Sequence, residues 1–271
     1  MNKVILITGG SQGIGASTAY LAAMNGHTVC INYHQNKSAA DDVARNIAND
    51  GGEAVSFKAD VSNEAEVEKL FLYIDSELGK ITALVNNAGV IESQMRFVDM
   101  TGKRLQNTFA INVIGSFMCA REAIKRMSAN WNGTGGSIVN ISSIAARLGA
   151  PFEYIDYAAS KGAIESMTIG LAKEVADENI RVNAVRPGLI HTDIHKKAGE
   201  PGRLERLKNT IPLKRAGQPR KLQTPSYGCS QKKHRMSPER LWMLLADVEL
   251  VQVLRVNLIV SHRSEQLCNT I

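Results

Sequence analysis

The stretch that decides the fold is Thr8-Gly9-Gly10-Ser11-Gln12-Gly13-Ile14-Gly15, which joins an apolar run at Val4–Thr8 to a helical window at Gly13–Asn25. Glycine permits a tight turn and removes the Cβ that would keep a pyrophosphate away from the backbone. The helix that follows offers unpaired N–H groups and the positive end of its dipole to the same group. A glycine-rich turn alone is common, but its place between a strand and a helix predicts a dinucleotide site.

The rest of the chain, up to about residue 190, repeats this alternation of short apolar runs and helical windows. Strands are predicted at Val4–Thr8, Thr28–Tyr33, Ala54–Lys58, Ala83–Asn86, Ser137–Ile141 and Arg181–Val185. Helices are predicted near Gly13–Asn25, Ser38–Asp50, Glu64–Leu78, Thr101–Ser128 and Tyr154–Asp177, with Ser38 and Asn63 as N-caps. The pattern indicates a single-domain α/β fold, a Rossmann-type doubly wound parallel sheet that binds ligands at the carboxyl ends of its strands.

Composition narrows the class of protein. The 271 residues are 44% hydrophobic, enough for one packed α/β domain. No apolar run approaches the roughly 20 residues of a membrane span. The four cysteines show neither metal spacing nor a disulfide framework, which favours a cytoplasmic protein.

The net charge of +6 does not point to nucleic acid as a partner. Residues 220–271 hold eight Lys and Arg against four Asp and Glu, a net of +4, so the first 219 residues carry only +2. No basic stripe interleaved with aromatic residues is present, as nucleic-acid binding would favour.

The segment Tyr157-Ala158-Ala159-Ser160-Lys161 carries the chemistry that the fold needs. Side chains four residues apart share one face of a helix. A tyrosine has an ordinary pKa of about 10, and a nearby ammonium lowers it towards the range useful for proton transfer. Tyr154 has Ala158 as its i+4 neighbour and so lacks the cation, which makes Tyr157 the candidate acid.

Taken together, these segments resemble the classical short-chain dehydrogenase/reductase family over about residues 3–219. The family fingerprint Thr-Gly-x-x-x-Gly-Ile-Gly is matched in full, and Asp60-Val61, Asn86-Asn87-Ala88-Gly89 and Pro187-Gly188 follow in the family's order, with Thr192 after them. The resemblance implies cofactor contacts at Gly9, Ser11, Gln12, Gly13, Ile14, Gly15, Asp60, Val61, Asn87, Ala88, Gly89, Tyr157, Lys161, Pro187, Gly188, Ile190 and Thr192. His34, which follows the second predicted strand, is a further candidate for a cofactor contact.

The resemblance also implies a catalytic tetrad of Asn112, Ser143, Tyr157 and Lys161. In that reading Lys161 binds the nicotinamide ribose, Ser143 orients the carbonyl, and Asn112 links Lys161 to solvent through a water. Asn112 otherwise reads as a satisfied buried amide. Ser142 stays open as the alternative serine, because Ser143 precedes Tyr157 by fourteen residues where the family spacing resembles thirteen.

The segment after the second strand bears on the choice of cofactor. An NAD enzyme commonly places an acid there to bond the ribose 2′-hydroxyl. Ile31-Asn32-Tyr33-His34-Gln35-Asn36-Lys37 contains no acid, and His34 or Lys37 can meet a 2′-phosphate. NADP(H) is therefore favoured and NAD(H) remains possible, since Gln12 stands where many NADP-preferring members have Arg.

The function implied is hydride transfer between a nicotinamide cofactor and a small carbonyl or secondary alcohol. The branch resembled holds 3-oxoacyl carrier-protein reductases and glucose dehydrogenases, whose members imply a homo-oligomer, tetramer or dimer. No metal is expected, because His191 and His195 have i,i+4 spacing but no third ligand. The segment Gly188–Leu213 does not identify the substrate.

The resemblance stops near residue 219, dividing the chain into a catalytic domain at 1–219 and an anomalous tail at 220–271. Suitable codons for Lys221–Glu249, read two bases later, encode a peptide ending Met-Asp-Val-Ala-Gly-Gly-Arg before a stop, as the family requires. A frameshift near Arg220 is therefore predicted, against the alternative of a divergent or added tail. The last helix and strand are then lost or replaced, and the competing function is an impaired nucleotide-binding product.

Overall fold

The computed structural model describes residues 3–192, 194–210, 214–219, 240–241 and 254–255. Six strands form one parallel sheet in the order β3-β2-β1-β4-β5-β6. Their bounds are β1 Lys3–Ile7, β2 His27–Tyr33, β3 Glu53–Lys58, β4 Ile81–Asn86, β5 Gly136–Ile141 and β6 Ile180–Val185. The order reverses between β1 and β4, the switch point at which such sheets bind ligands. The predicted Rossmann-type sheet is confirmed.

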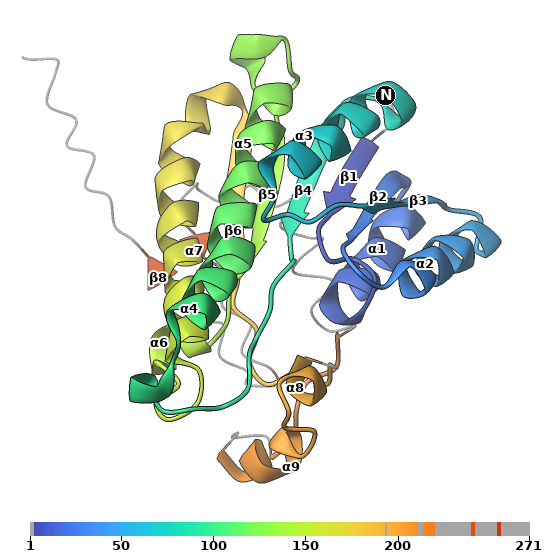
Figure 1. Cartoon of the computed structure of the whole chain (residues 1–271). Helices are drawn as coiled ribbons and strands as arrows, with labels where there is room; N and C mark the ends of the chain where they lie inside the picture. The colour runs from blue at the N-terminus through green and yellow to red at the C-terminus, as the bar shows by residue number, and fades with distance from the viewer. Residues whose placement is uncertain (1–2, 193, 211–213, 220–239, 242–253, 256–271) are drawn as a thin grey trace, which may run out of the picture.

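Helices cover both faces of this sheet (Figure 1). The longer ones are α1 Gly13–Met24, α2 Lys37–Asn49, α3 Glu64–Tyr73, α4 Gly102–Phe109, α5 Gly115–Met127 and α7 Ile155–Glu174. The shorter elements are α6 Ala145–Leu148, α8 Ile194–Lys197, α9 Arg203–Leu207, the π-helical turns η1 Ile74–Leu78 and η3 Ala110–Ile114, and the 3-10 turns η2 Phe97–Asp99, η4 Ala129–Trp131, η5 Ala176–Glu178 and η6 Lys208–Thr210. α8 and α9 lie apart from the sheet's covering helices, at the end towards which β1 points (Figure 1).

The core consists of two apolar layers because successive side chains of a strand point to opposite faces. Val4 and Leu6 of β1 pack with residues of α3, α5 and α7. Ile5 and Ile7 pack on the other face with α1 and α2. Strands buried on both faces need continuous apolar runs, which is why the sequence located them well.

A buried polar chain fixes α7 against the sheet. The Asn86 side-chain amide donates to Asn140 Oδ1 at 2.9 Å, and the Asn140 amide donates to Thr168 Oγ1 of α7 at 2.9 Å. All three side chains are almost fully buried. A shift of α7 along the sheet would leave the buried Asn140 amide without its acceptor on Thr168, so this bond opposes such a shift.

The helix ends partly correct the sequence prediction. Asn63 caps α3 as expected, accepting from the Glu66 N–H. The cap of α2 is Asn36 and not Ser38, because the Asn36 side chain reaches the Ala39 N–H from the position before the first helical residue. The single helix predicted over Thr101–Ser128 is interrupted by the π-helical turn η3.

At Gly217 the described chain folds back on the segment that follows β6. Ile190 and Gly217 form a parallel bridge, with the His191 N–H donating to the Gly217 carbonyl oxygen at 2.9 Å. Within the described residues no strand pairs with the outer edge of β6; the two-residue strands β7 Arg240–Leu241 and β8 Leu254–Arg255 pair only with each other. The predicted loss or replacement of the last helix and strand concerns residues that mostly lie outside the described part of the chain.

Candidate active site

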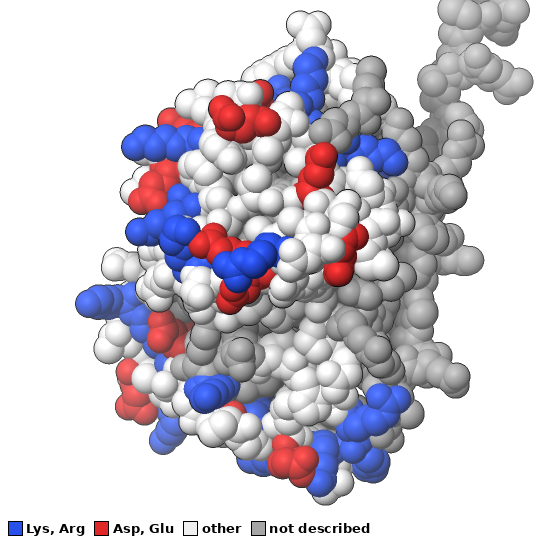
Figure 2. Space-filling view, turned by 90° about the vertical axis from the view of Figure 1, so that its right-hand side faces the viewer, with Lys and Arg blue, Asp and Glu red and all other residues white. Residues whose placement is uncertain are grey.

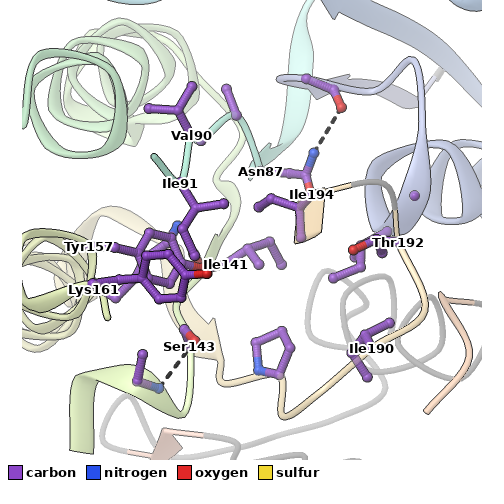
Figure 3. A pocket seen from close by; sticks show the side chains of 18 of the residues that line it. Asn87, Val90, Ile91, Ile141, Ser143, Tyr157, Lys161, Ile190, Thr192 and Ile194 are labelled. Carbon is purple, nitrogen blue, oxygen red and sulfur yellow. Dashed lines mark hydrogen bonds between the residues drawn. The ribbon is translucent and has the colours of Figure 1, made fainter. Parts of the chain in front are cut away.

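A cavity of about 1360 Å³ lies at the carboxyl ends of the strands. Of the predicted site residues, it is lined by Gly9, Ser11, Gln12, Gly13, Ile14, His34, Asp60, Asn87, Ala88, Gly89, Ser143, Tyr157, Lys161, Pro187, Gly188, Ile190 and Thr192. Figure 3 shows Tyr157, Lys161 and Ser143 on one side of this cavity and Thr192 and Ile190 across from them. Gly15, Val61 and Asn112 are not among the residues that line this cavity, and the cofactor contacts of Gly15 and Val61 stay predictions.

The glycine turn is built for close backbone approach. Gly9 has a φ of +60°, and a Cβ there would lie 2.9 Å from the Cα of Ala88. A Cβ on Gly15 would lie 2.5 Å from the Asn87 Nδ2, which explains the need for glycine at a position behind the lining. Two of the fingerprint glycines thus allow the first helix to pack against the segment after β4.

The first helix keeps its leading N–H groups available. Asn36, Asn63 and Thr101 cap α2, α3 and α4 with side-chain oxygens, whereas Gln12 before α1 makes no side-chain cap. Uncapped N–H groups at a helix N-terminus favour an anion. Because this end of α1 borders the cavity, the turn fits the pyrophosphate of a dinucleotide.

The Asn-Asn-Ala-Gly segment is tied to the end of β1. The Thr8 hydroxyl oxygen accepts from the N–H groups of Asn87 and Ala88 at 3.0 Å each. The Asn87 side-chain amide donates to the Thr8 and Gly9 carbonyl oxygens at 2.9 Å each. The strand ends of β1 and β4 are therefore locked together under the cavity.

The end of β2 presents a histidine to the cavity and no carboxylate of its own. Tyr33, His34, Gln35 and Asn36 line the wall here. The nearest acid comes from another strand, with Asp60 Oδ2 at 3.7 Å from His34 Nε2. Lys37, the other cation considered for a 2′-phosphate, does not line the cavity and pairs with Asp41 along α2.

The two candidate serines have different surroundings. The Ser142 hydroxyl is buried and donates to Glu165 Oε1 at 2.8 Å. The Ser143 hydroxyl accepts from the Ala145 N–H at 3.1 Å, and its side chain lines the cavity with Tyr157, where hydrogen bonding to the phenol acts to lower the pKa of Tyr157. The geometry therefore favours Ser143 as the partner of Tyr157 in the cavity.

Burial dominates the acidity of Tyr157. The pKa of Tyr157 lies above its ordinary value because burial disfavours the phenolate, and the Ser143 hydrogen bond and the Arg203 charge only partly oppose this. The direction predicted from the i,i+4 spacing was wrong here. Lys161 Nζ lies 5.7 Å from the centre of the Tyr157 ring and donates instead to the Ile141 carbonyl oxygen at 2.8 Å.

Lys161 itself is tuned by burial. Its side chain is almost fully buried, which lowers the pKa of the ammonium to about 8. An amine with that pKa exchanges protons near neutral pH. Gly89 leaves room beside it, since a Cβ there would lie 3.5 Å from Lys161 Nζ and 3.3 Å from Asn112 Oδ1.

Asn112 sits in the π-helical turn η3 and is fully buried. Its side chain pairs with one backbone residue after β4, accepting from the Val90 N–H at 2.8 Å and donating to the Val90 carbonyl oxygen at 3.0 Å. The amide also donates to Ser160 Oγ at 3.1 Å. The turn thus places Asn112 between the β4 loop and the helix of Tyr157 and Lys161.

Comparison with known proteins agrees with this geometry. The family model for short chain dehydrogenases matches residues 3–202. The chain belongs to the short-chain dehydrogenase family. As a member of this family, the protein is an NAD(P)-dependent oxidoreductase.

Several short-chain dehydrogenases resemble it over most of its length. The uncharacterized oxidoreductase YgfF of Escherichia coli K12 is 50% identical over 215 residues, 79% of this chain and 87% of that protein. The 3-oxoacyl-[acyl-carrier-protein] reductase of Synechocystis is 36% identical over 217 residues, 80% and 84% of the two chains. A crystal structure of a short-chain type dehydrogenase/reductase from Mycobacterium marinum gives a TM-score of 0.82 at 31% identity, over 90% and 94% of the two chains.

The sequence did not reveal a cluster of charged residues around Arg203 at the wall of the cavity in this short-chain dehydrogenase. Arg203 of α9 lines it, lies over the Tyr154 ring at 4.8 Å, and pairs with Glu153 at 2.6 Å and Glu200 at 3.0 Å. These residues belong to no motif. A hint was available only in the clustering of opposite charges between Glu200 and Arg206.

Replacing Gly9 with Ala tests whether the glycine turn between Thr8 and Gly15 is needed for stability and for cofactor binding. Gly9→Ala is expected to lower the free energy of unfolding by about 1–3 kcal/mol and to weaken NADPH binding, because Ala strains the positive φ and meets Ala88. Urea unfolding and NADPH fluorescence titration measure the two effects. Gly170→Ala on α7, where a Cβ meets nothing, is the control and should be neutral or stabilising by about 0.5–1 kcal/mol. Wild-type behaviour of Gly9→Ala in both measurements would contradict the role of this turn.

Proposed function

We propose that the protein transfers a hydride between NADP(H) and a small carbonyl or secondary alcohol. The observation that carries this proposal is the placement of Tyr157, Lys161 and Ser143 together on the wall of one cavity, which the uncapped end of α1 also borders. The proposed proton donor, Tyr157, and the glycine turn before α1, which is the proposed phosphate cradle, therefore border the same cavity.

Tyr157 and Ser143 act directly on the oxygen of the substrate. In the reductive direction the Tyr157 phenol gives its proton to the carbonyl oxygen, and in the oxidative direction it takes the proton from the alcohol. Ser143 donates a hydrogen bond to the same oxygen while negative charge develops on it. The bound nicotinamide supplies or accepts the hydride.

Lys161 and Asn112 support the proton transfer. Lys161, with its pKa near 8, holds the nicotinamide ribose on the same wall of the cavity as Tyr157. Asn112 links Lys161 to solvent through a water beside Gly89. Gly13, Ile14 and Thr192 hold the cofactor's phosphate and amide groups.

NADP(H) is the proposed cofactor because of the charges near the end of β2. No carboxylate follows that strand in the cavity wall, and His34 is the group placed to meet a 2′-phosphate. Asp60 beside His34 is the opposing influence, because it brings one negative charge to the same corner. Relatives named 3-oxoacyl-[acyl-carrier-protein] reductase also support this choice.

The proposed partners are small molecules and copies of the same chain. Ile114, Phe117 and Ile169 expose large apolar side chains on η3, α5 and α7, a surface suited to a tetramer or dimer.

On the face in Figure 2, Lys and Arg side chains are interspersed with Asp and Glu among the described residues, without the basic stripe that nucleic-acid binding favours. In the described part of the chain no helix is long and apolar enough to cross a membrane. The protein is also proposed to be cytoplasmic and to bind no metal.

We further propose that residues 220–271 arise from a reading-frame slip. Matches to three of the relatives span 215–219 residues, about the length of the predicted catalytic domain. The competing function, a nucleotide-binding chain of impaired turnover, follows if the altered tail prevents assembly. In the part of the chain that the structure describes, no strand pairs with the outer edge of β6, and such an edge would favour that outcome.

Replacing Tyr157 with Phe tests the proposed function. Tyr157→Phe removes only the acidic proton, so turnover should fall by about 10²–10⁴-fold while NADPH binding persists. NADPH oxidation with a panel of ketones and aldehydes measures turnover. Tyr73→Phe, a tyrosine stacked on Phe57 away from the cavity, is the control. If Tyr157→Phe turns over as fast as wild type, or Tyr154→Phe loses as much, the proton donor is misassigned.

A second test concerns the cofactor. His34→Asp places a carboxylate where a 2′-phosphate would lie, so the ratio of kcat/KM for NADPH over NADH should drop about tenfold or more. Lys37→Ala is the matched control and should leave the ratio unchanged, since Lys37 is outside the cavity wall. A His34→Asp chain with an unaltered ratio would remove His34 from cofactor recognition.

A third test concerns the tail. Replacing the residues from Lys221 onward with the alternative-frame peptide should raise the melting temperature by about 10 °C or more, because each kcal/mol is worth roughly 2–4 °C in a domain this size. Turnover should rise with it. Calorimetry and the same carbonyl panel compare the two chains. A gene whose alternative frame lacks this peptide ends the proposal.

A further inference from the structure

A buried ion pair lies beneath the catalytic side chains. Arg186, the residue directly after β6, is fully buried, and its Nε lies 2.6 Å from Glu165 Oε1. Its Nη2 bonds the other carboxylate oxygen, so the pair is bidentate. Glu165 stands on α7 one helical turn after Lys161, so the pair joins the end of β6 to the helix of the proposed acid.

Ser142 connects this pair to the serine loop. Its hydroxyl donates to Glu165 Oε1 at 2.8 Å and also lies 3.3 Å from the Lys161 carbonyl oxygen. The backbone is held at both sides of Ser143, because the Ser142 N–H donates to the Val185 carbonyl oxygen at 2.8 Å and the Ile144 N–H donates to that of Pro187 at 2.9 Å. Ser143 therefore sits on a short span whose preceding side chain is bonded to Glu165.

Stability gives little reason for such a pair. Removing two charges from water costs free energy that their attraction often fails to repay. Here Arg186 Nη1 is also buried with no acceptor among the described residues, which adds a further cost. The other cation near Glu165 is Arg147, half-exposed, with its Nε 3.7 Å from Glu165 Oε2. What the pair supplies is a fixed geometry among β5, β6 and α7.

We infer that Glu165, held by Arg186, is a positioning residue that sets Ser143 against Tyr157 through the Ser142 hydroxyl. The inference rests on the proposed roles of Ser143 and Tyr157 in proton transfer. It also explains the two adjacent serines. Both line the cavity, but the Ser142 hydroxyl donates to Glu165 and anchors the loop, which leaves Ser143 as the partner of Tyr157. Losing the anchor should weaken the Ser143–Tyr157 hydrogen bond without changing either residue.

The test measures the titration midpoint of the Tyr157 phenol. The full chain is labelled with 3-fluorotyrosine, whose lower phenol pKa brings titration within reach, and the ¹⁹F signal missing from Tyr157→Phe is Tyr157. Ser142→Ala, which leaves the ion pair intact, should raise the midpoint of that titration by about 0.5–1 pH unit, because the Ser143 hydrogen bond favours the phenolate. Ser143→Ala should give the same rise, and the double variant no more than Ser143→Ala alone.

Changes to the pair extend the test. Glu165→Gln should reproduce the Ser142→Ala shift and lower kcat about 5- to 10-fold with the Kd for NADPH unchanged. If the uncompensated Arg186 unfolds that variant, Glu165→Gln/Arg186→Met removes both charges together and should show the same shift. Glu122→Gln is the control, a buried carboxylate on α5 paired with Lys125 and Arg126 away from the cavity, and should leave the Tyr157 signal unmoved.

Two results would overturn the inference. One is a Tyr157 titration that stays at the wild-type midpoint in both Ser142→Ala and the Glu165 variants. The other is a shift in Ser142→Ala/Ser143→Ala equal to the sum of the single shifts, which would show that Ser142 acts independently of Ser143. Failure of the proposed function is separate, because it appears as undiminished carbonyl reduction by Tyr157→Phe whatever the fluorine signals do.

Discussion

The hydrogen bond from Lys161 Nζ to the Ile141 carbonyl oxygen, 2.8 Å long, is the contact on which the site depends. It joins the middle of α7 to the last residue of β5, and both partners are buried. A buried amine needs such an acceptor because water cannot reach it, so the helix cannot slide along the sheet without leaving it unpaired. Tyr157, one turn earlier on α7, and Ser143, two residues beyond Ile141, are brought to the same wall as a result.

Much of this arrangement is readable from the amino-acid sequence because local rules decide it. Strands covered on both faces must be apolar throughout, so all six were located to within a few residues. The fingerprint between Thr8 and Gly15 places the first helix, and a spacing of four puts Tyr157 and Lys161 on one face. Each of these features depends on neighbours close in the chain, where periodicity and turn chemistry act.

The features that escaped prediction depend on partners far away in sequence. The π-helical turn around Asn112 exists because that amide pairs with the backbone of Val90, which only the folded sheet brings near. The acidity of Tyr157 follows the burial around it more than the cation beside it, and burial is a property of the whole cavity. The salt bridge between Glu165 and Arg186 joins residues on different elements, and neither carries a motif.

The bridge between Ile190 and Gly217 has a consequence for how such a protein can diversify. It joins the two ends of the stretch that contains α8 and α9, so these ends stay side by side whatever the sequence between them. That stretch carries Arg203, which lines the cavity and whose charge lowers the pKa of Tyr157. A change of sequence between Ile190 and Gly217 can therefore alter the acidity of the Tyr157 phenol as well as the wall of the cavity, so the two properties are inherited together.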